Sequence, residues 1–391
     1  MGAHREGSGV VIVGSGLGGY TLAREFRKLD RLRPLTLITA DNGEMYSKPM
    51  LSNAFGQNKA VEALVQKTAE QAAAELAIGL LPRHRVTAID RAASMLAVTG
   101  AEERQIPYEQ LVLALGADPR PFTAAGSEAV PVATVNDLDG YRSWRRDLAP
   151  AARVLLIGAG LIGCEFANDL AIGGHRVTVI EPAGWPLGRL LPAALGRLLH
   201  EALEQAGVTI HTGRSVVRMA PAGGEGFTAV LDDGTELAFD RALSAIGLAP
   251  RTALAATAGL AVARGIVVDR FLRSSDPAIF AIGDCAETEA GPLPFVLPLM
   301  AQARALAATL AGHETPLSLP ALPVVVKTPC LPLAVCPPPA GIGGEWIIAG
   351  QGRDQKALFQ GTDGRPLGFA LSGAAVAERQ ALAKDMPGLM G

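Results

Sequence analysis

Glycines at a fixed spacing occur twice in this chain of 391 residues, and their pattern suits them to nucleotide binding. Gly14, Gly16 and Gly19 form a G-x-G-x-x-G turn in which Ser15 follows the first glycine. Such a turn lets the backbone approach a pyrophosphate, and the following helix offers its N-terminal N–H groups and positive dipole end to the phosphate charge. The pattern alone is weak evidence, so its setting decides the interpretation.

The setting of the first turn is that of a dinucleotide-binding unit. An apolar run at residues 10–13 precedes it, a helical pattern follows from about Tyr20 to Leu29, and a second apolar run covers Leu35 to Thr39. Continuous apolar runs of this kind are typical of strands buried on both faces of a parallel sheet. The order strand, glycine turn, helix and strand therefore predicts that the first turn binds a dinucleotide.

The same order returns in the middle of the chain, where Gly158, Gly160 and Gly163 form the turn. The strand predicted after it, residues 176–180, ends at Glu181. A carboxylate there accepts hydrogen bonds from the ribose of NADH and repels the 2′-phosphate of NADPH, so we expect NADH. The alternative is a solvated turn carboxylate. A chain with two such folds binds two dinucleotides, and hydride passes directly between a flavin and a nicotinamide.

Composition excludes several other classes of function. The net charge of −3 argues against nucleic acid as a partner, because binding a phosphate backbone needs an excess of Lys and Arg. No long uncharged apolar stretch predicts a membrane span, and residues 1–9 lack the apolar segment of a secretory signal, so we expect a cytoplasmic protein. The histidines are scattered and the four cysteines form no C-x-x-C pair, so we expect neither a metal site nor a redox-active disulfide of that type.

The remaining segments predict how the chain is organised. Apolar strands at 111–115 and 242–246, each followed by glycine and proline, are typical of chain crossings between domains. The last part, residues 315–391, has a proline-dense segment, short alternating runs and a final helix, which indicate a small α+β domain. We predict an FAD-binding domain formed by residues 1–116 and 248–314, an NAD-binding domain at 117–247 and a C-terminal domain at 315–391.

A third motif identifies the fold as one of a known type. A predicted buried strand, residues 279–282, ends in Gly283 and Asp284. With both glycine turns before it, this motif resembles that of the two-dinucleotide-fold flavoprotein reductases. The resemblance implies two doubly wound, Rossmann-like domains of the glutathione reductase type. It also implies that the first fold holds FAD, with Asp284 at the ribityl chain, and that a helix near Pro298 directs its N-terminus at the flavin.

The segment after the first dinucleotide-binding unit indicates which branch of this family the chain resembles. Disulfide reductases of this family carry a cysteine pair there and peroxide-reducing members a single cysteine, whereas residues 46–53 contain none. Most of the chain resembles bacterial rubredoxin–NAD(+) reductases. The segments that carry this resemblance are Tyr46–Ser52, Val154–Leu170, Gly265–Arg270, Val326–Pro329, Leu371–Val376 and Pro387–Met390.

The resemblance implies roles for individual residues. Lys48 and Lys327 are expected at the flavin and Glu165 at the flavin–nicotinamide junction, and we take these three as the catalytic side chains. Val86 is expected near the adenine and Val296 close to the isoalloxazine. Solvated lysines and an exposed helix carboxylate are the alternatives.

Two positions depart from the pattern of the wider family. Ala40 precedes Asp41 at the end of the second strand, so the contact of Asp41 with the adenosine ribose is left open. Asn53 stands where ferredoxin-reducing relatives often carry lysine, which favours the rubredoxin branch.

The two glycine turns predict hydride transfer from NADH to FAD, and the resemblance implies an enzyme that then passes single electrons to an acidic rubredoxin. The close alternative is an NADH-dependent reductase of a [2Fe–2S] ferredoxin, and the alternative of another class is an NAD-sensing binding protein. The cations expected either to dock rubredoxin or to form a solvated helix face are Arg24, Arg27, Lys28, Arg31 and Arg33.

Overall fold

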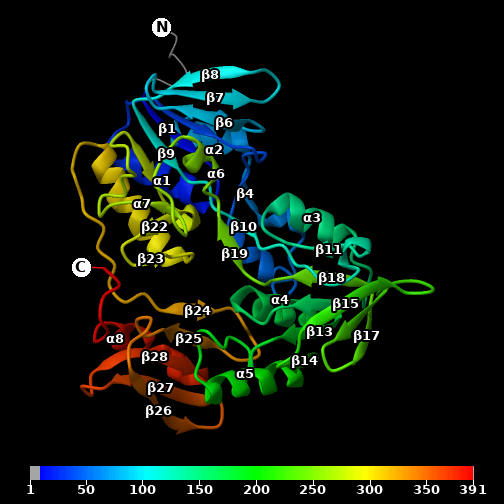
Figure 1. Cartoon of the computed structure of the whole chain (residues 1–391). Coiled ribbons are helices and arrows are strands. Elements are labelled where there is room, and N and C mark those ends of the chain that lie inside the picture. Colours follow the sequence, from blue (N-terminus) through cyan, green and yellow to red (C-terminus); the bar gives the residue numbers. More distant parts are fainter. Residues whose placement is uncertain (1–8, 391) are drawn as a thin grey trace.

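The apolar runs near the N-terminus form the central strands of a five-stranded parallel sheet in the computed structural model, which describes residues 9–390 (Figure 1). The strands lie side by side in the order β21 (Ile279–Ala281), β9 (Gln110–Leu113), β1 (Val10–Val13), β2 (Leu35–Ile38) and β5 (Gly79–Leu81). All four residues of β1 and of β2 are buried, as a parallel sheet covered on both faces requires.

Two helices pack against each other beside this sheet. They are α1 (Leu17–Leu29) and α7 (Val296–Leu310), and both contribute to one hydrophobic core with the sheet. Two smaller sheets and two helices complete the unit. The antiparallel sheet consists of β6 (Arg85–Asp90), β7 (Met95–Thr99) and β8 (Arg104–Pro107). The mixed sheet consists of β20 (Ile266–Val267), β22 (Ala286–Thr288) and β23 (Gly291–Pro292), and the helices are α2 (Ala69–Leu76) and α6 (Ala253–Thr257).

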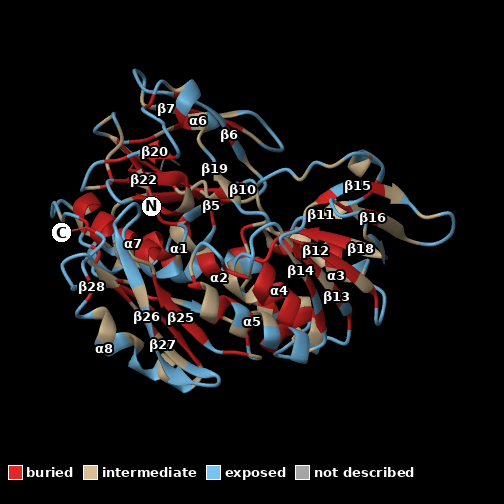
Figure 2. Ribbon diagram, turned by 60° about the horizontal axis from the view of Figure 1, so that its bottom comes forward, coloured by how far each residue is buried: buried red, intermediate tan, exposed pale blue. Residues whose placement is uncertain are grey.

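The middle of the chain repeats this architecture. The second parallel sheet has the order β11 (Val132–Ala133), β18 (Arg241–Ser244), β12 (Arg153–Ile157), β13 (Arg176–Glu181) and β14 (Val208–Thr212). Its helices are α3 (Leu138–Arg146), α4 (Leu161–Ile172) and α5 (Ala193–Gln205), and an antiparallel arm consists of β15 (Val216–Pro221), β16 (Phe227–Leu231) and β17 (Glu236–Phe239). Eight of the twelve residues of α4 are buried, so this helix lies inside the molecule (Figure 2).

The two repeats are joined by two antiparallel strands, β10 (Ala117–Pro119) and β19 (Leu248–Pro250). These strands directly follow the segments predicted to be chain crossings. The predicted domain boundaries at 116/117 and 247/248 fall at their starts, and the division of the chain into domains at these positions remains a prediction.

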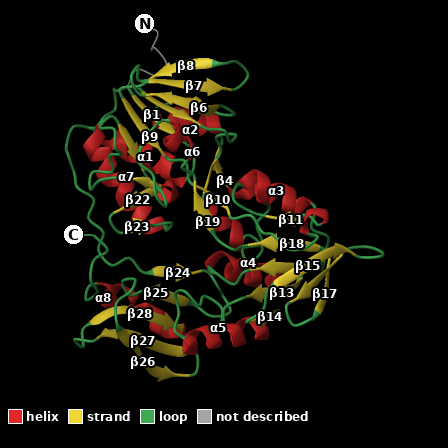
Figure 3. Cartoon of the chain, in the orientation of Figure 1, coloured by secondary structure: helices red, strands yellow, loops and turns green. Residues whose placement is uncertain are grey.

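The last part of the chain forms a five-stranded antiparallel sheet (Figure 3). Its order is β24 (Val324–Val326), β25 (Leu333–Cys336), β28 (Pro366–Ser372), β27 (Asp354–Gly361) and β26 (Gly344–Gln351). The final helix α8 (Arg379–Ala383) is short. Leu317, Leu319 and Met390 pack in the core of the first repeat, so both ends of this segment return to it.

A segment of the first repeat packs on the second repeat and thereby positions the site. It comprises β3 (Met45–Tyr46) and the 3-10 helices η1 (Lys48–Asn53) and η2 (Val61–Leu64), followed by β4 (Val65–Lys67). Asp169 of α4 accepts hydrogen bonds from the backbone N–H groups of Phe55 and Gly56, at 3.2 and 2.7 Å. Leu51 and Ala54 share a core with residues of the second sheet and of β25.

Some boundaries of helices and strands predicted from the sequence were wrong. The first helix begins at Leu17, three residues earlier than predicted, because Gly16 is already its N-cap. Strand β2 ends at Ile38, one residue early, and β13 continues through Glu181. Within residues 9–390 no helix is both long enough and apolar enough to cross a bilayer.

Candidate functional site

The first glycine turn has the geometry of a phosphate cradle. Gly14 has a φ of +116°, and a Cβ there would overlap the carbonyl oxygen of Ala114. A Cβ on Gly19 would overlap the carbonyl oxygen of Gly14, whereas a Cβ on Gly16 would meet no atom within 4 Å. Two glycines therefore allow the turn to pack, and the third leaves open space where a pyrophosphate can approach. Ser15 donates a hydrogen bond to Thr39 Oγ1 at 2.8 Å, which ties the turn to the end of β2.

The second turn repeats this geometry. Gly158 has a φ of +99°, a Cβ on Gly163 would overlap the Gly158 carbonyl oxygen, and a Cβ on Gly160 would meet nothing within 4 Å. Glu181 lies beside this turn and accepts hydrogen bonds from the backbone N–H groups of Ala159 and Ala183, at 2.6 and 2.8 Å. These bonds fix the carboxylate at the position from which it can meet a ribose.

Glu165 of α4 is buried, with 1% of its surface exposed, and brings three parts of the chain together. Its Oε2 accepts hydrogen bonds from Ser52 Oγ at 2.6 Å and from Lys327 Nζ, and its Oε1 accepts one from the Lys327 backbone N–H at 3.1 Å. Lys327 also donates to Ser52 Oγ at 3.1 Å. The buried carboxylate is thus compensated by an ion pair and two further hydrogen bonds.

Lys48 at the start of η1 has a different kind of partner. Its Nζ donates to the amide oxygen of Asn136 at 2.5 Å, and Asn136 donates in turn to the backbone carbonyl of Ala117 in β10 at 2.9 Å. Burial lowers the pKa of Lys48, and the nearby charge of Asp284 opposes this effect. Burial likewise raises the pKa of Asp284, against the effect of Lys48. Lys48 and Asp284 therefore lie near enough for the charge of each to act on the pKa of the other.

Gly283 and Asp284 lie at the end of β21, beside the N-terminal part of α7. The Gly283 N–H donates to Gln302 Oε1 of α7 at 2.7 Å, and Gly283 has a φ of +75°, which favours glycine. No side chain caps the N-terminus of α7, and Val296 in its first turn is 41% exposed. The first N–H groups of α7 are therefore free to face a ligand of partial negative charge.

Comparison with known proteins assigns the chain to a family. Residues 8–307 match the family described as pyridine nucleotide-disulphide oxidoreductase. The chain belongs to this family. Residues 316–386 match a second family, described as the rubredoxin binding C-terminal domain.

Relatives in this oxidoreductase family cover nearly the whole chain. A rubredoxin-NAD(+) reductase of Alcanivorax borkumensis is 42% identical over 97% of this chain and 99% of its own length. A nitric oxide reductase FlRd-NAD(+) reductase of Aeromonas hydrophila is 38% identical over 97% of this chain and 96% of its own.

Solved structures of the family have the same fold. The putidaredoxin reductase in its covalent complex with putidaredoxin has a TM-score of 0.87 at 28% identity, covering 98% of this chain and 94% of that one. A ferredoxin reductase from Rhodopseudomonas palustris also has a TM-score of 0.87, at 29% identity, covering 97% and 95%. These findings confirm the predicted fold class, the oxidoreductase activity and the use of FAD and NAD(H).

The cysteines of this family member are poorly suited to electron relay by thiolate chemistry. Cys164, Cys285 and Cys336 are buried and Cys330 is half-buried, and all four are free. Burial raises the pKa of Cys164, and it raises that of Cys285, Cys330 and Cys336 to about 11. Because the thiolate is the reactive form, none of these groups is activated at neutral pH. Among residues 9–390, no three His, Cys, Asp or Glu side chains are grouped to hold a metal ion.

Asp41 and Val86, the remaining residues predicted to contact FAD, lie in the first repeat. Asp41 follows β2, and its carboxylate accepts a hydrogen bond from the Asn42 N–H at 2.7 Å, while burial raises its pKa. Val86 is buried in β6 and belongs to the core of the first repeat. The predicted roles of Asp41 and Val86 at the adenosine remain predictions.

Sequence reasoning missed three polar residues of the site: Ser52, Asn136 and Gln302. Ser52 lies within the segment that the resemblance singled out, and its position four residues after Lys48 was a usable signal. Asn136 and Gln302 contact residues that are distant in the sequence, Lys48 and Gly283, so no local pattern predicted these contacts.

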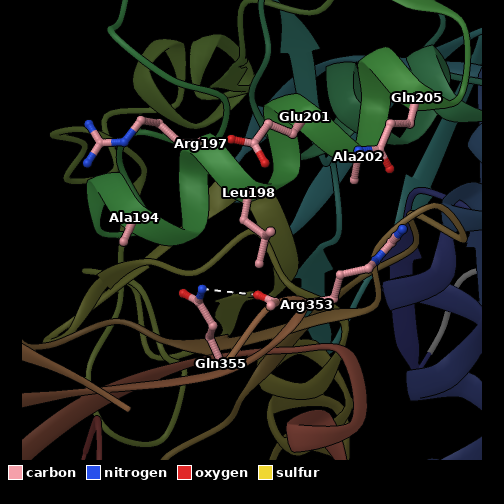
Figure 4. A pocket seen from close by; sticks show the side chains of 9 residues that line it. Ala194, Arg197, Leu198, Glu201, Ala202, Gln205, Arg353 and Gln355 are labelled. Carbon is pink, nitrogen blue, oxygen red and sulfur yellow. Dashed lines mark hydrogen bonds between the residues drawn. The ribbon is translucent and has the colours of Figure 1, made fainter. Parts of the chain in front are cut away.

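A separate cavity of about 480 Å³ lies between α5 and the turn that joins β26 and β27. Figure 4 shows Leu198 of α5 pointing toward the segment that carries Arg353 and Gln355. None of the glycine turns or predicted lysines lines it, so it is distinct from the dinucleotide site.

Substituting Gly16 and Gly19 one at a time distinguishes the role of the first glycine turn in packing from its role in phosphate binding. We expect Gly16→Ala to leave the melting temperature of the apoprotein within about 2 °C of the wild type but to weaken FAD binding at least tenfold. Gly19→Ala is the matched control, because its methyl group overlaps the Gly14 carbonyl, and we expect it to lower the melting temperature of the apoprotein itself. Thermal unfolding and FAD titration measure both; wild-type FAD affinity in Gly16→Ala would contradict the assignment of the cradle.

Proposed function

We propose that this chain is an NADH-dependent rubredoxin reductase that holds FAD on its first fold and NADH on its second. The observation that carries the proposal is the match of residues 316–386 to a rubredoxin binding domain, next to two glycine cradles in one chain. The 42% identity to a rubredoxin-NAD(+) reductase over nearly the full length supports it. We also propose that the protein acts in the cytoplasm.

The chemistry belongs to the cofactors: FAD, when bound, accepts hydride from NADH and releases two electrons one at a time. Overall, NADH and two oxidised rubredoxins give NAD⁺, a proton and two reduced rubredoxins. The protein's own part is to hold the two dinucleotides, to stabilise negative charge at the reduced flavin, and to present it to the carrier.

We assign the residues of the site to these tasks. Lys48 and Lys327 stabilise the negative charge of the reduced flavin, while Glu165 orients Lys327 at the junction with the nicotinamide. Asp284 accepts from the ribityl chain, and Val296 bounds the isoalloxazine at the start of α7. The remaining proposed cofactor-binding residues are Gly14, Ser15, Gly16, Gly19, Asp41 and Val86 for FAD, Gly158, Gly160, Gly163 and Glu181 for NADH, and Gly283 beside Asp284.

Two of the five cations considered as a rubredoxin dock, Arg27 and Arg33, form contacts inside the first repeat. Arg27 donates to the backbone carbonyls of Leu76 and Ala77, at 3.0 and 2.9 Å. Arg33 donates to the carbonyl of Leu310 and pairs with Glu109. These arginines anchor the C-terminal end of α1, and the proposal therefore does not rest on this face for docking.

Reduction of a [2Fe–2S] ferredoxin is the second candidate. It is favoured by the similarity of fold to a putidaredoxin reductase and to a ferredoxin reductase, at 28 and 29% identity. The higher identity to rubredoxin-NAD(+) reductases favours the first candidate.

Direct competition between the carriers tests the proposal. FAD-loaded protein, reduced anaerobically by NADH, is mixed with rubredoxin or with a [2Fe–2S] ferredoxin in a stopped-flow instrument. We expect two rubredoxins reduced per NADH and a kcat/KM for rubredoxin at least tenfold above that for the ferredoxin. A preference for the ferredoxin would overturn the carrier assignment, and tight retention of NAD with reduction of neither carrier would indicate a sensor.

The nucleotide preference depends on Glu181. We expect kcat/KM for NADH to exceed that for NADPH at least a hundredfold, because the carboxylate repels the 2′-phosphate. Glu181→Gln keeps an acceptor for the Ala159 or Ala183 N–H but removes the charge, so this ratio should fall at least tenfold. Glu201→Gln, on α5 away from the turn, is the matched control and should leave the ratio unchanged; an unchanged ratio in Glu181→Gln would refute the role.

A further inference from the structure

The two lysines assigned to the flavin differ in how their charges are compensated. Lys327 forms an ion pair with the buried carboxylate of Glu165. Lys48 donates instead to a neutral acceptor, the amide oxygen of Asn136. Among the ion pairs formed within residues 9–390, none includes Lys48.

Most of the charged groups around Lys48 are engaged by other partners. The groups that influence it are the carboxylates of Asp284, Asp137 and Asp118 and the guanidinium of Arg251. Asp118 pairs with Arg251 at 2.6 Å, and Asp137 accepts a hydrogen bond from the Gly140 N–H at 2.7 Å as the N-cap of α3. Asp284, in contrast, forms no ion pair with Lys48 or with another cation of residues 9–390, although its charge acts on Lys48.

Asn136 is held in one orientation by the fold. Its Nδ2 donates to the carbonyl of Ala117 in β10, and β10 pairs with β19 at the junction of the two repeats. Because the amide nitrogen has a carbonyl partner, the amide oxygen must face Lys48. The neighbouring Leu138 N–H donates to Tyr46 Oη at 3.2 Å, so the segment that carries Lys48 is fastened to this loop at two points.

We propose that Asn136 is a positioning residue: it holds the Lys48 ammonium with a neutral acceptor and so adds no negative charge that would offset the charge of the lysine at the reduced flavin. A carboxylate at this position would hold the ammonium equally well, but it would cancel most of the charge felt by a third group nearby. The inference rests on the proposed function only in placing Lys48 at the flavin.

The midpoint potential of bound FAD, measured anaerobically against reference dyes with dithionite as reductant, tests this role. Asn136→Asp places a carboxylate against Lys48, and we expect it to lower the equilibrium constant for two-electron reduction at least tenfold, which is a shift of about 30 mV to more negative potential. Asn136→Leu removes both hydrogen bonds without adding a charge and should shift the potential by less than a third as much.

Controls separate this role from a structural one. In a Lys48→Met background, the Asn136→Asp change should have little further effect, because it acts through the lysine. Equal shifts in Asn136→Asp and Asn136→Leu, or a full Asn136→Asp shift in the Lys48→Met background, would overturn the proposal. Melting temperatures of the apoproteins report any loss of folding. Wild-type protein whose FAD is reduced by dithionite but not by NADH would refute the proposed function while leaving this comparison intact.

Discussion

The arrangement of this molecule depends on a carboxylate that is buried and must be compensated. Glu165 lies on α4, and its partners come from η1 in the first repeat and from the residue that follows β24 in the C-terminal part. Breaking a buried pair of this kind typically costs about 3–5 kcal/mol, because the remaining charge stays in a poorly solvated place. Three distant segments therefore meet at one point, on the helix that follows the second glycine turn. The same interaction that joins these segments also fixes Lys327, which we propose to lie at the flavin.

The second lysine, Lys48, is held by a different kind of partner. Lys48 is fixed by an amide in the loop between β11 and α3, whereas Lys327 is fixed by a carboxylate. One lysine is thus paired with a carboxylate, and the other is held by a neutral amide. A neutral flavin gains negative charge on reduction, and under the proposed roles the lysine held by the amide stabilises this charge more strongly than the ion-paired lysine does. Burial raises the pKa of Cys330 and Cys336 to about 11, which disfavours the reactive thiolate form.

Local features of this chain could be predicted from the sequence, and long-range ones could not. The glycine turns, the buried strands and Glu181 each have a signal within about 30 residues, and the parallel sheets followed from them. The order of strands within each sheet could not be predicted, because it depends on segments far apart in the chain. The same holds for the partners of Glu165, Lys48 and Asn136, because hydrophobic periodicity reports only on local structure. Arg27 illustrates the limit: as one of several cations near a helix end it suggested a docking surface, but its guanidinium caps the carbonyls at the end of α2. The early start of α1 was missed because a helix that begins on a glycine N-cap lacks the usual side-chain signal.

The central claim is that the two dinucleotides exchange hydride directly and that no thiol stores electrons on the way to the carrier. Anaerobic titration of the FAD-loaded protein with NADH, followed by flavin absorbance, measures this capacity. The account predicts an end point at one NADH per FAD, with complete bleaching of the flavin. An end point at two NADH per FAD, with a disulfide reduced before the flavin, would contradict it.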